Sequence, residues 1–194
     1  MNFLAHLYLS GNDEEIMVGN FIGDFVKGKA YEVYSINIQR GIMLHRHIDE
    51  YTDHHEIVSN SKKRLWNKYR HYAGVIVDMF YDHFLAANWS AFHQTPLADY
   101  AQYVYKLMLS HESRLPKGVR YMLPFMIDHN WLLSYANKDG IHNALSGMAR
   151  RTTFTSRMDE AIADLDNHYD EFESEFQAFF PDLRAFVGEW LKNN

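Results

Sequence analysis

The chain has no cysteine, only 4 prolines and no run of about 18 apolar residues that could cross a membrane. The absence of cysteine excludes disulfides, thiolate zinc sites, iron–sulfur clusters and a cysteine nucleophile. Any metal ligand or catalytic group is therefore a histidine, an acid or a hydroxyl. The first residues carry no basic, apolar leader, so we expect a cytoplasmic protein without a membrane span.

Positive charge is also scarce, because the net charge is −6. This balance argues against a general nucleic-acid binder, which needs a basic footprint to neutralise phosphates. Residues 23–74 nevertheless hold nine Lys and Arg against six acids, whereas residues from 159 onward hold ten acids and two bases. Either the first half faces an anionic partner or the split is chance variation in charge.

The 194 residues, 47% of them hydrophobic, are enough for one soluble domain with a single core, residues 1–194. Apolar residues recur at helical spacing almost throughout, so the sequence predicts an all-α fold, a compact bundle of six to eight helices. Capping residues and breakers predict the helices as 12–28, 35–56, 59–89 with an interruption near Gly74, 95–115, 119–135, 140–150, 158–180 and 183–191.

Four of the twelve histidines lie beside acids in residues 44–55, the densest polar cluster of the chain. His45, Asp49 and Asp53 follow one another at intervals of four, which places them on one face of a helix. A histidine and an acid one turn apart can present two ligands to a divalent cation, and acids favour the harder metals. The alternative is a solvated polar face, but the apolar neighbours Ile42 and Leu44 indicate burial, where paired acids are costly.

A second acidic pair lies in the apolar segment 75–85, where Asp78 and Asp82 are one turn apart and His83 follows. No Lys or Arg lies between Gly74 and Trp89, so a counter-charge must come from elsewhere, and a metal would supply it. The alternatives are a buried acid bonded to Arg40 or Arg46, or a helix-capping contact.

Glycines at 19, 23 and 28 recur near helical spacing around Asp24, which predicts close approach of another backbone. His6 stands alone in the apolar stretch 2–7, and a single histidine there is more often a core residue than a ligand.

Several of these segments together resemble the acyl carrier protein phosphodiesterases. The matching motifs are Asn2–Leu7, Gly19–Gly28, Gly41–Asp53, Asp78–Leu85, Gly147–Arg151, Asp164–Asp170 and Phe179–Pro181.

The resemblance implies a cytoplasmic, HD-domain-like helical hydrolase that uses Mn²⁺ or Mg²⁺. Its substrate would be holo acyl carrier protein, whose 4′-phosphopantetheine is cut from a serine to leave the apo protein. In the HD pattern the adjacent pair is His-Asp, whereas here Asp82-His83 stands in reversed order.

We therefore expect metal ligands at His6, Asp24, His45, Asp82 and His83. Asp24, His45 and Asp49 are the expected catalytic residues. Asp49 is expected to act as general base or to orient the ligands, with Asp53 or Asp78 sharing that work. Arg46 or Lys27 would hold a phosphate oxygen, and a basic segment would dock the acidic carrier: Lys62, Lys63, Arg64, Lys68 and Arg70.

Two other functions remain open at this level. One is a related phosphohydrolase acting on a nucleotide or small phosphodiester. The other is a non-enzymatic helical adaptor, in which the acids merely pair with arginines such as Arg40, Arg46, Arg150 and Arg151.

Overall fold

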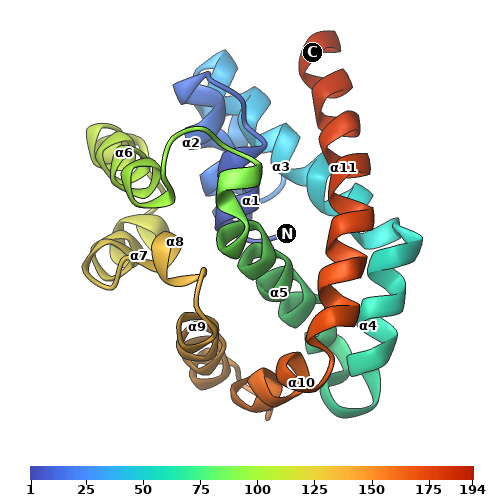
Figure 1. Ribbon diagram of the computed structural model, residues 1–194. Coiled ribbons are helices and arrows are strands. Elements are labelled where there is room, and N and C mark those ends of the chain that lie inside the picture. The colour runs from blue at the N-terminus through green and yellow to red at the C-terminus, as the bar shows by residue number, and fades with distance from the viewer.

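The computed structural model describes all 194 residues and contains helices and no strand, so the all-α prediction is confirmed (Figure 1). None of its helices is long and apolar enough to cross a membrane. The α-helices are α1 (Phe3–Tyr8), α2 (Glu14–Ile22), α3 (Ile36–His54), α4 (Glu56–Tyr69), α5 (Ala73–Ala87), α6 (Leu97–Ser110), α7 (Lys117–Asp128), α8 (Trp131–Ser134), α9 (Lys138–Arg151), α10 (Ala161–Asn167) and α11 (Tyr169–Asn193).

The chain is divided into more helices than the six to eight predicted. Arg70 and Asn130 take positive φ angles of 50° and 43°, which end α4 and separate α7 from α8. Conversely, α11 continues through Pro181, where a break was predicted, and the chain divides at His168 instead. Proline removes one helical hydrogen bond, but Phe176, Phe180 and Leu183 are buried on both sides of it and hold the helix in place.

Helix starts were easier to predict than helix ends. The Asp13 side chain accepts a hydrogen bond from the Ile16 amide and caps α2, and Ser35 occupies the N-cap position of α3. The first predicted helix ends early, because α2 gives way at Ile22 to a 3₁₀ turn, η1 (Gly23–Phe25). Gly28 lies beyond it with a φ of +54°.

Close contact between α2 and α3 positions the candidate site. A Cβ on Gly19 would lie 2.1 Å from the Ile38 carbonyl oxygen, and one on Gly41 would lie 2.2 Å from that of Ile16. A Cβ on Gly23 would lie 2.3 Å from Cγ of His45, so this glycine leaves room for the imidazole. The predicted close approach of another backbone is thus confirmed at Gly19, whereas Gly23 faces a side chain and a Cβ on Gly28 would have no neighbour within 4 Å.

Helix α5 runs through the middle of the molecule, with α11 and α4 on one side and α6 to α9 on the other (Figure 1). Its side chains are buried almost throughout, and aromatic rings of α11 pack against it, among them Phe172 against Phe80 and Phe176 against Tyr81. One hydrophobic core joins all the helices around the site.

Candidate metal centre

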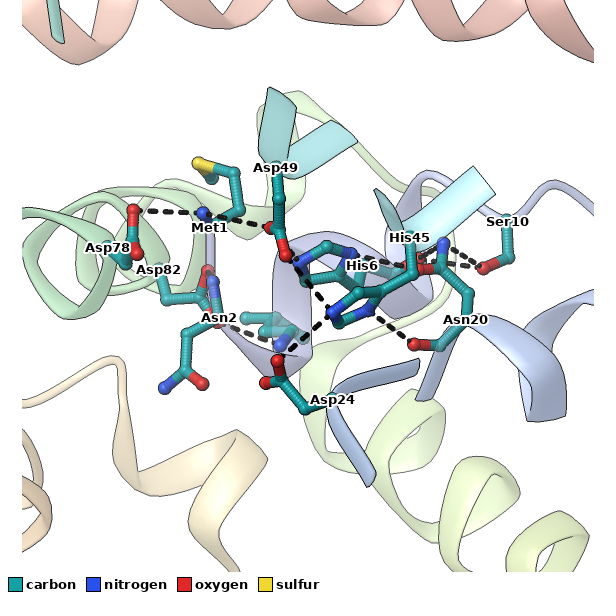
Figure 2. A network of polar contacts seen from close by, with 11 residues as sticks. Met1, Asn2, His6, Ser10, Asn20, Asp24, His45, Asp49, Asp78 and Asp82 are labelled. Atoms are coloured by element: carbon teal, nitrogen blue, oxygen red, sulfur yellow. Dashed lines mark hydrogen bonds and ion pairs between the residues drawn. The ribbon is translucent and has the colours of Figure 1, made fainter. Parts of the chain in front are cut away.

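Two histidines and an acid from two helices meet at one point (Figure 2). His6 comes from α1, and its ring stacks on that of His45 from α3, with the centroids 4.0 Å apart. Asp49 lies one turn beyond His45. Its Oδ1 is 3.2 Å from His6 Nε2, and its Oδ2 is 3.2 Å from His45 Nε2. We call these three residues the His6–His45–Asp49 cluster.

Asn20 of α2 fixes both imidazoles. Its side-chain oxygen accepts a hydrogen bond from His6 Nδ1 at 2.8 Å, and its backbone oxygen accepts one from His45 Nδ1 at 2.8 Å. The Asn20 amide nitrogen donates to the His6 carbonyl and to Ser10 Oγ, so the orientation of the amide is defined. Both rings therefore carry a proton on Nδ1 and turn Nε2 toward Asp49, as metal-binding histidines do.

The two Nε2 atoms are buried and have no hydrogen-bond partner. They lie within ion-pair distance of Asp49, but the carboxylate is not placed to accept a hydrogen bond from either. His6 and His45 are only 2% and 5% exposed, so bulk solvent does not reach these atoms. A buried polar atom without a partner is costly, and a bound cation would remove that cost.

The charges around the cluster point the same way. Burial, helped by the nearby His45, lowers the pKa of His6. Burial alone would lower the pKa of His45, but Asp24 and Asp49 raise it to about 9. Burial opposes ionisation of Asp49, yet the two histidines hold the pKa of this carboxyl well below its usual range. The acids thus stay ionised and hold a positive charge, here the proton of His45, at the point where a cation would bind.

Asp24 is the second acid at His45, and it lies in the turn η1. Its Oδ1 is 3.4 Å from His45 Nε2, and contact with this imidazole lowers the pKa of Asp24. Its side chain is 67% exposed, so it forms the open side of the centre. Asp24 and Asp49 line a cavity of about 450 Å³, together with Asp53, Asp78 and Arg151 among others.

The other two acids of this cavity have partners of their own. Asp53 continues the predicted face of α3 but binds Lys62, 2.6 Å away. Asp78 accepts a hydrogen bond from the Met1 α-amino group at 2.9 Å, and that amino group lies 4.0 Å from Asp49.

Asp82 and His83 are not brought to the cluster. The Asp82 carboxylate accepts hydrogen bonds from the backbone amides of Asn2 at 3.0 Å and Leu4 at 2.7 Å, which is the alternative of a helix-capping contact. Burial raises the pKa of Asp82 to about 7. The His83 ring binds the Tyr135 carbonyl through Nδ1 and the Tyr169 hydroxyl through Nε2, so neither nitrogen is free. Both predicted ligands instead join α5 to other parts of the fold.

The predicted phosphate contacts also have different surroundings. Arg46 donates to the carbonyls of Val26 and Gly28 at 3.0 and 2.8 Å and lies over the Tyr31 ring, so it braces the loop after η1. Lys27 is exposed and does not line the cavity of Asp24 and Asp49.

Most of the predicted docking segment is neutralised within the chain. Lys62 pairs with Asp53, Arg64 pairs with Glu175 at 2.8 Å, and Lys68 pairs with Asp164 at 2.9 Å. Only Lys63 and Arg70 of this segment have no acidic partner, so it offers an anionic protein little free charge.

Two important residues were missed from the sequence. Asn20 lies within the motif Gly19–Gly28 but was not predicted as a site residue, although a buried amide on an apolar helix indicates a hydrogen-bonding role. Arg151 was considered only as a partner for acids, yet it lines the cavity and makes no ion pair or hydrogen bond.

The ligand atoms of the His6–His45–Asp49 cluster, all within 4.8 Å of one another, fit a divalent cation. Two imidazole nitrogens and a carboxylate oxygen form a mixed nitrogen and oxygen donor set, which suits a divalent first-row transition metal. The two buried Nε2 atoms without partners are the observation that supports this fit.

Comparison with known proteins agrees with the motifs. Residues 1–183 match the family model described as acyl carrier protein phosphodiesterase. The chain belongs to this family. A relative named acyl carrier protein phosphodiesterase from Photorhabdus laumondii is 34% identical over 182 residues, which cover 93% of this chain and 92% of the relative. One of the same name from Escherichia coli is 32% identical over 186 residues, covering 95% and 96%.

No solved structure matches the chain. The likeness of this acyl carrier protein phosphodiesterase family member to HD phosphohydrolases therefore stays a prediction.

Proposed function

We propose that this chain, acting as one helical domain over residues 1–194, hydrolyses the phosphodiester of holo acyl carrier protein. Water adds to phosphorus, the bond from phosphorus to the serine oxygen breaks, and a proton passes to that oxygen. The products are apo carrier protein and 4′-phosphopantetheine. The observation that carries the proposal is the pair of buried, unpartnered Nε2 atoms facing Asp49, in a chain of this family.

His6, His45 and Asp49 would hold a divalent cation, and Asp24 would complete the ligand set from the open side. When bound, the cation supplies Lewis-acid polarisation of the phosphate and lowers the pKa of a water molecule. Mn²⁺ suits this set better than Mg²⁺, because Mg²⁺ prefers oxygen ligands throughout.

Each protein group then has one task. Asn20 holds both imidazoles with Nε2 directed into the centre. Asp49 bridges the two Nε2 atoms, and this position favours a ligand over the general base that the sequence suggested. Asp24 is exposed beside the cavity, so it lies between the centre and an incoming phosphodiester.

The test is to incubate the purified protein with holo carrier protein and Mn²⁺ and to weigh the carrier by mass spectrometry. We expect the carrier to lose the mass of the phosphopantetheine arm, and we expect EDTA to prevent this loss. A His83→Ala variant, which removes an imidazole outside the cluster, should retain turnover if it remains folded.

An unchanged carrier mass with the metal-loaded wild type would refute the substrate. In that case, hydrolysis of a nucleotide or small phosphodiester would point to a related phosphohydrolase. Turnover that persists in EDTA would refute the cation.

A further inference from the structure

A second cavity adjoins the one that Asp24 and Asp49 line. It has a volume of about 720 Å³ and lies among α7, α8 and α9, which follow one another along one side of α5 (Figure 1). Four residues line both cavities: Met122, Trp131, Met148 and Arg151. The two spaces share this boundary, and the pair of them extends from the candidate metal centre past Arg151 to α7. We call this pair of cavities the α7–α9 groove.

The walls of the groove are mixed in character. The rings of Tyr121 and Phe125 of α7 are tilted against each other with their centroids 5.6 Å apart, and the two residues are 76% and 50% exposed. Trp131 and Met148 continue the apolar wall toward the centre. Asn143 adds an exposed amide that makes no hydrogen bond within the protein. Such a combination of apolar contact and a few polar groups is typical of a site for a slender organic ligand.

Arg151 stands where the two cavities meet, and Arg150 lies beside it in the outer part of the groove. Neither guanidinium forms an ion pair or a hydrogen bond in the structure. By contrast, the basic residues Lys62, Arg64 and Lys68 of α4 each pair with an acid. A guanidinium without a partner beside a cavity is suited to a phosphate oxygen.

We propose that the α7–α9 groove binds the 4′-phosphopantetheine arm of the carrier, with Arg151 on the phosphate. This inference rests on the proposed function. The phosphate lies between the candidate metal centre and Arg151, and the arm extends into the outer cavity. Its gem-dimethyl and methylene groups contact the rings of α7 and Met148, and its amides meet Asn143.

Gly147 keeps the groove open. It lies within α9 and lines the outer cavity, and a Cβ added there would meet no atom closer than Arg150 Nη2 at 3.9 Å. No packing contact or positive φ therefore requires glycine at this position, and glycine within a helix lowers stability relative to alanine. A free groove accounts for its presence, because any side chain here would occupy space that the arm needs.

The test measures binding of free 4′-phosphopantetheine to the Mn²⁺-loaded full-length protein by calorimetry, so it does not depend on turnover. Gly147→Leu should weaken binding by roughly 5- to 100-fold, since it overfills the groove. Arg151→Gln should weaken binding by roughly 10- to 100-fold, because it removes a charged hydrogen bond. The matched controls are Gly188→Leu, which faces a different cavity on α11, and Arg120→Gln, an exposed arginine outside both cavities. Both should bind as wild type does.

Two smaller probes separate the ends of the groove. Inorganic phosphate should bind Arg151→Gln more weakly than it binds wild type, but it should bind Gly147→Leu as it binds wild type. Pantetheine, which lacks the phosphate, should bind Gly147→Leu more weakly than wild type and Arg151→Gln equally well.

The inference is overturned if wild type does not bind 4′-phosphopantetheine. It is also overturned if both test variants bind within about twofold of wild type, or if the controls lose as much affinity. Binding with the expected pattern but without hydrolysis of holo carrier would support the groove and refute the proposed function. Hydrolysis of holo carrier that neither Gly147→Leu nor Arg151→Gln impairs would support the proposed function and refute the role of the groove.

Discussion

Two pairs of buried polar groups, both predicted as metal ligands, prove to have different surroundings. Asp82 and His83 on α5 satisfy their hydrogen-bonding groups within the protein, through backbone amides, the Tyr135 carbonyl and the Tyr169 hydroxyl. His6 and His45 form a hydrogen bond only through Nδ1, and each leaves Nε2 without a hydrogen-bond partner, 3.2 Å from a carboxylate oxygen of Asp49.

From this difference we infer a structural role for Asp82 and His83 and a ligand-binding role for His6 and His45. A buried polar group with all its partners stabilises the fold, whereas one held firmly by one atom and unpartnered at the other is prepared for a ligand. Residue type and helical spacing are similar in the two regions. The two regions differ in whether the second nitrogen of each imidazole and the nearby carboxylate have hydrogen-bond partners within the protein.

The largest expected effect is on turnover and cation binding in His45→Ala. Removing this ligand should reduce Mn²⁺ affinity by more than the ~10- to 100-fold expected for a group that only supports a ligand. Hydrolysis of holo carrier should fall to background. His83→Ala is the matched control, because it also removes a buried imidazole, and it should keep the Mn²⁺ affinity of wild type. Calorimetric Mn²⁺ titration of both variants checks the comparison, and equal losses would invalidate it.

The next prediction contrasts two acids, one expected to affect stability and the other expected to affect Mn²⁺ binding. Asp82→Ala leaves the Asn2 and Leu4 amides unpaired and should lower the free energy of unfolding by about 2–5 kcal/mol. Asp24→Ala, at an exposed position, should change it by less than about 0.5 kcal/mol. Mn²⁺ binding should change in the opposite order, with a loss only in Asp24→Ala. Urea unfolding in EDTA, followed by Mn²⁺ titration of the folded variants, measures both quantities. A stable Asp82→Ala variant that no longer binds Mn²⁺ would contradict this prediction and indicate that Asp82 is a metal ligand.

A smaller effect is expected at Asn20. Asn20→Ala removes the acceptor of His6 Nδ1 but keeps the backbone carbonyl that fixes His45. Mn²⁺ affinity should fall by ~10- to 100-fold, less than in His45→Ala. The Nδ1 nitrogen of His6 should lose its hydrogen bond, and ¹⁵N NMR of the histidine rings detects this. An unchanged affinity would show that the orientation of His6 does not depend on Asn20.

Much of the fold could be predicted from local pattern. Apolar periodicity and capping residues such as Asp13 located the helices, because these signals act within a few residues. The divisions at Arg70 and Asn130 were missed, because positive φ angles at non-glycine residues are imposed by tertiary packing. Pro181 was taken as a break, but the buried phenylalanines on both sides of it keep α11 continuous.

The candidate site was only partly predictable for the same reason. His45 and Asp49 lie one turn apart on one helix, so their proximity is visible in the sequence. His6 reaches them only through the packing of α1 and α2 against α3, and the sequence pointed to it through family resemblance alone. The surroundings of Asp82 and His83 could not be predicted, because their partners lie up to 86 residues away along the chain.

The most direct test is a crystal structure of the Mn²⁺-loaded protein with anomalous diffraction at the manganese edge. The account predicts one strong peak bound by His6 Nε2, His45 Nε2 and an Asp49 oxygen, with Asp24 close by. A peak bound by Asp82 and His83, or no peak at the His6–His45–Asp49 cluster, would contradict it.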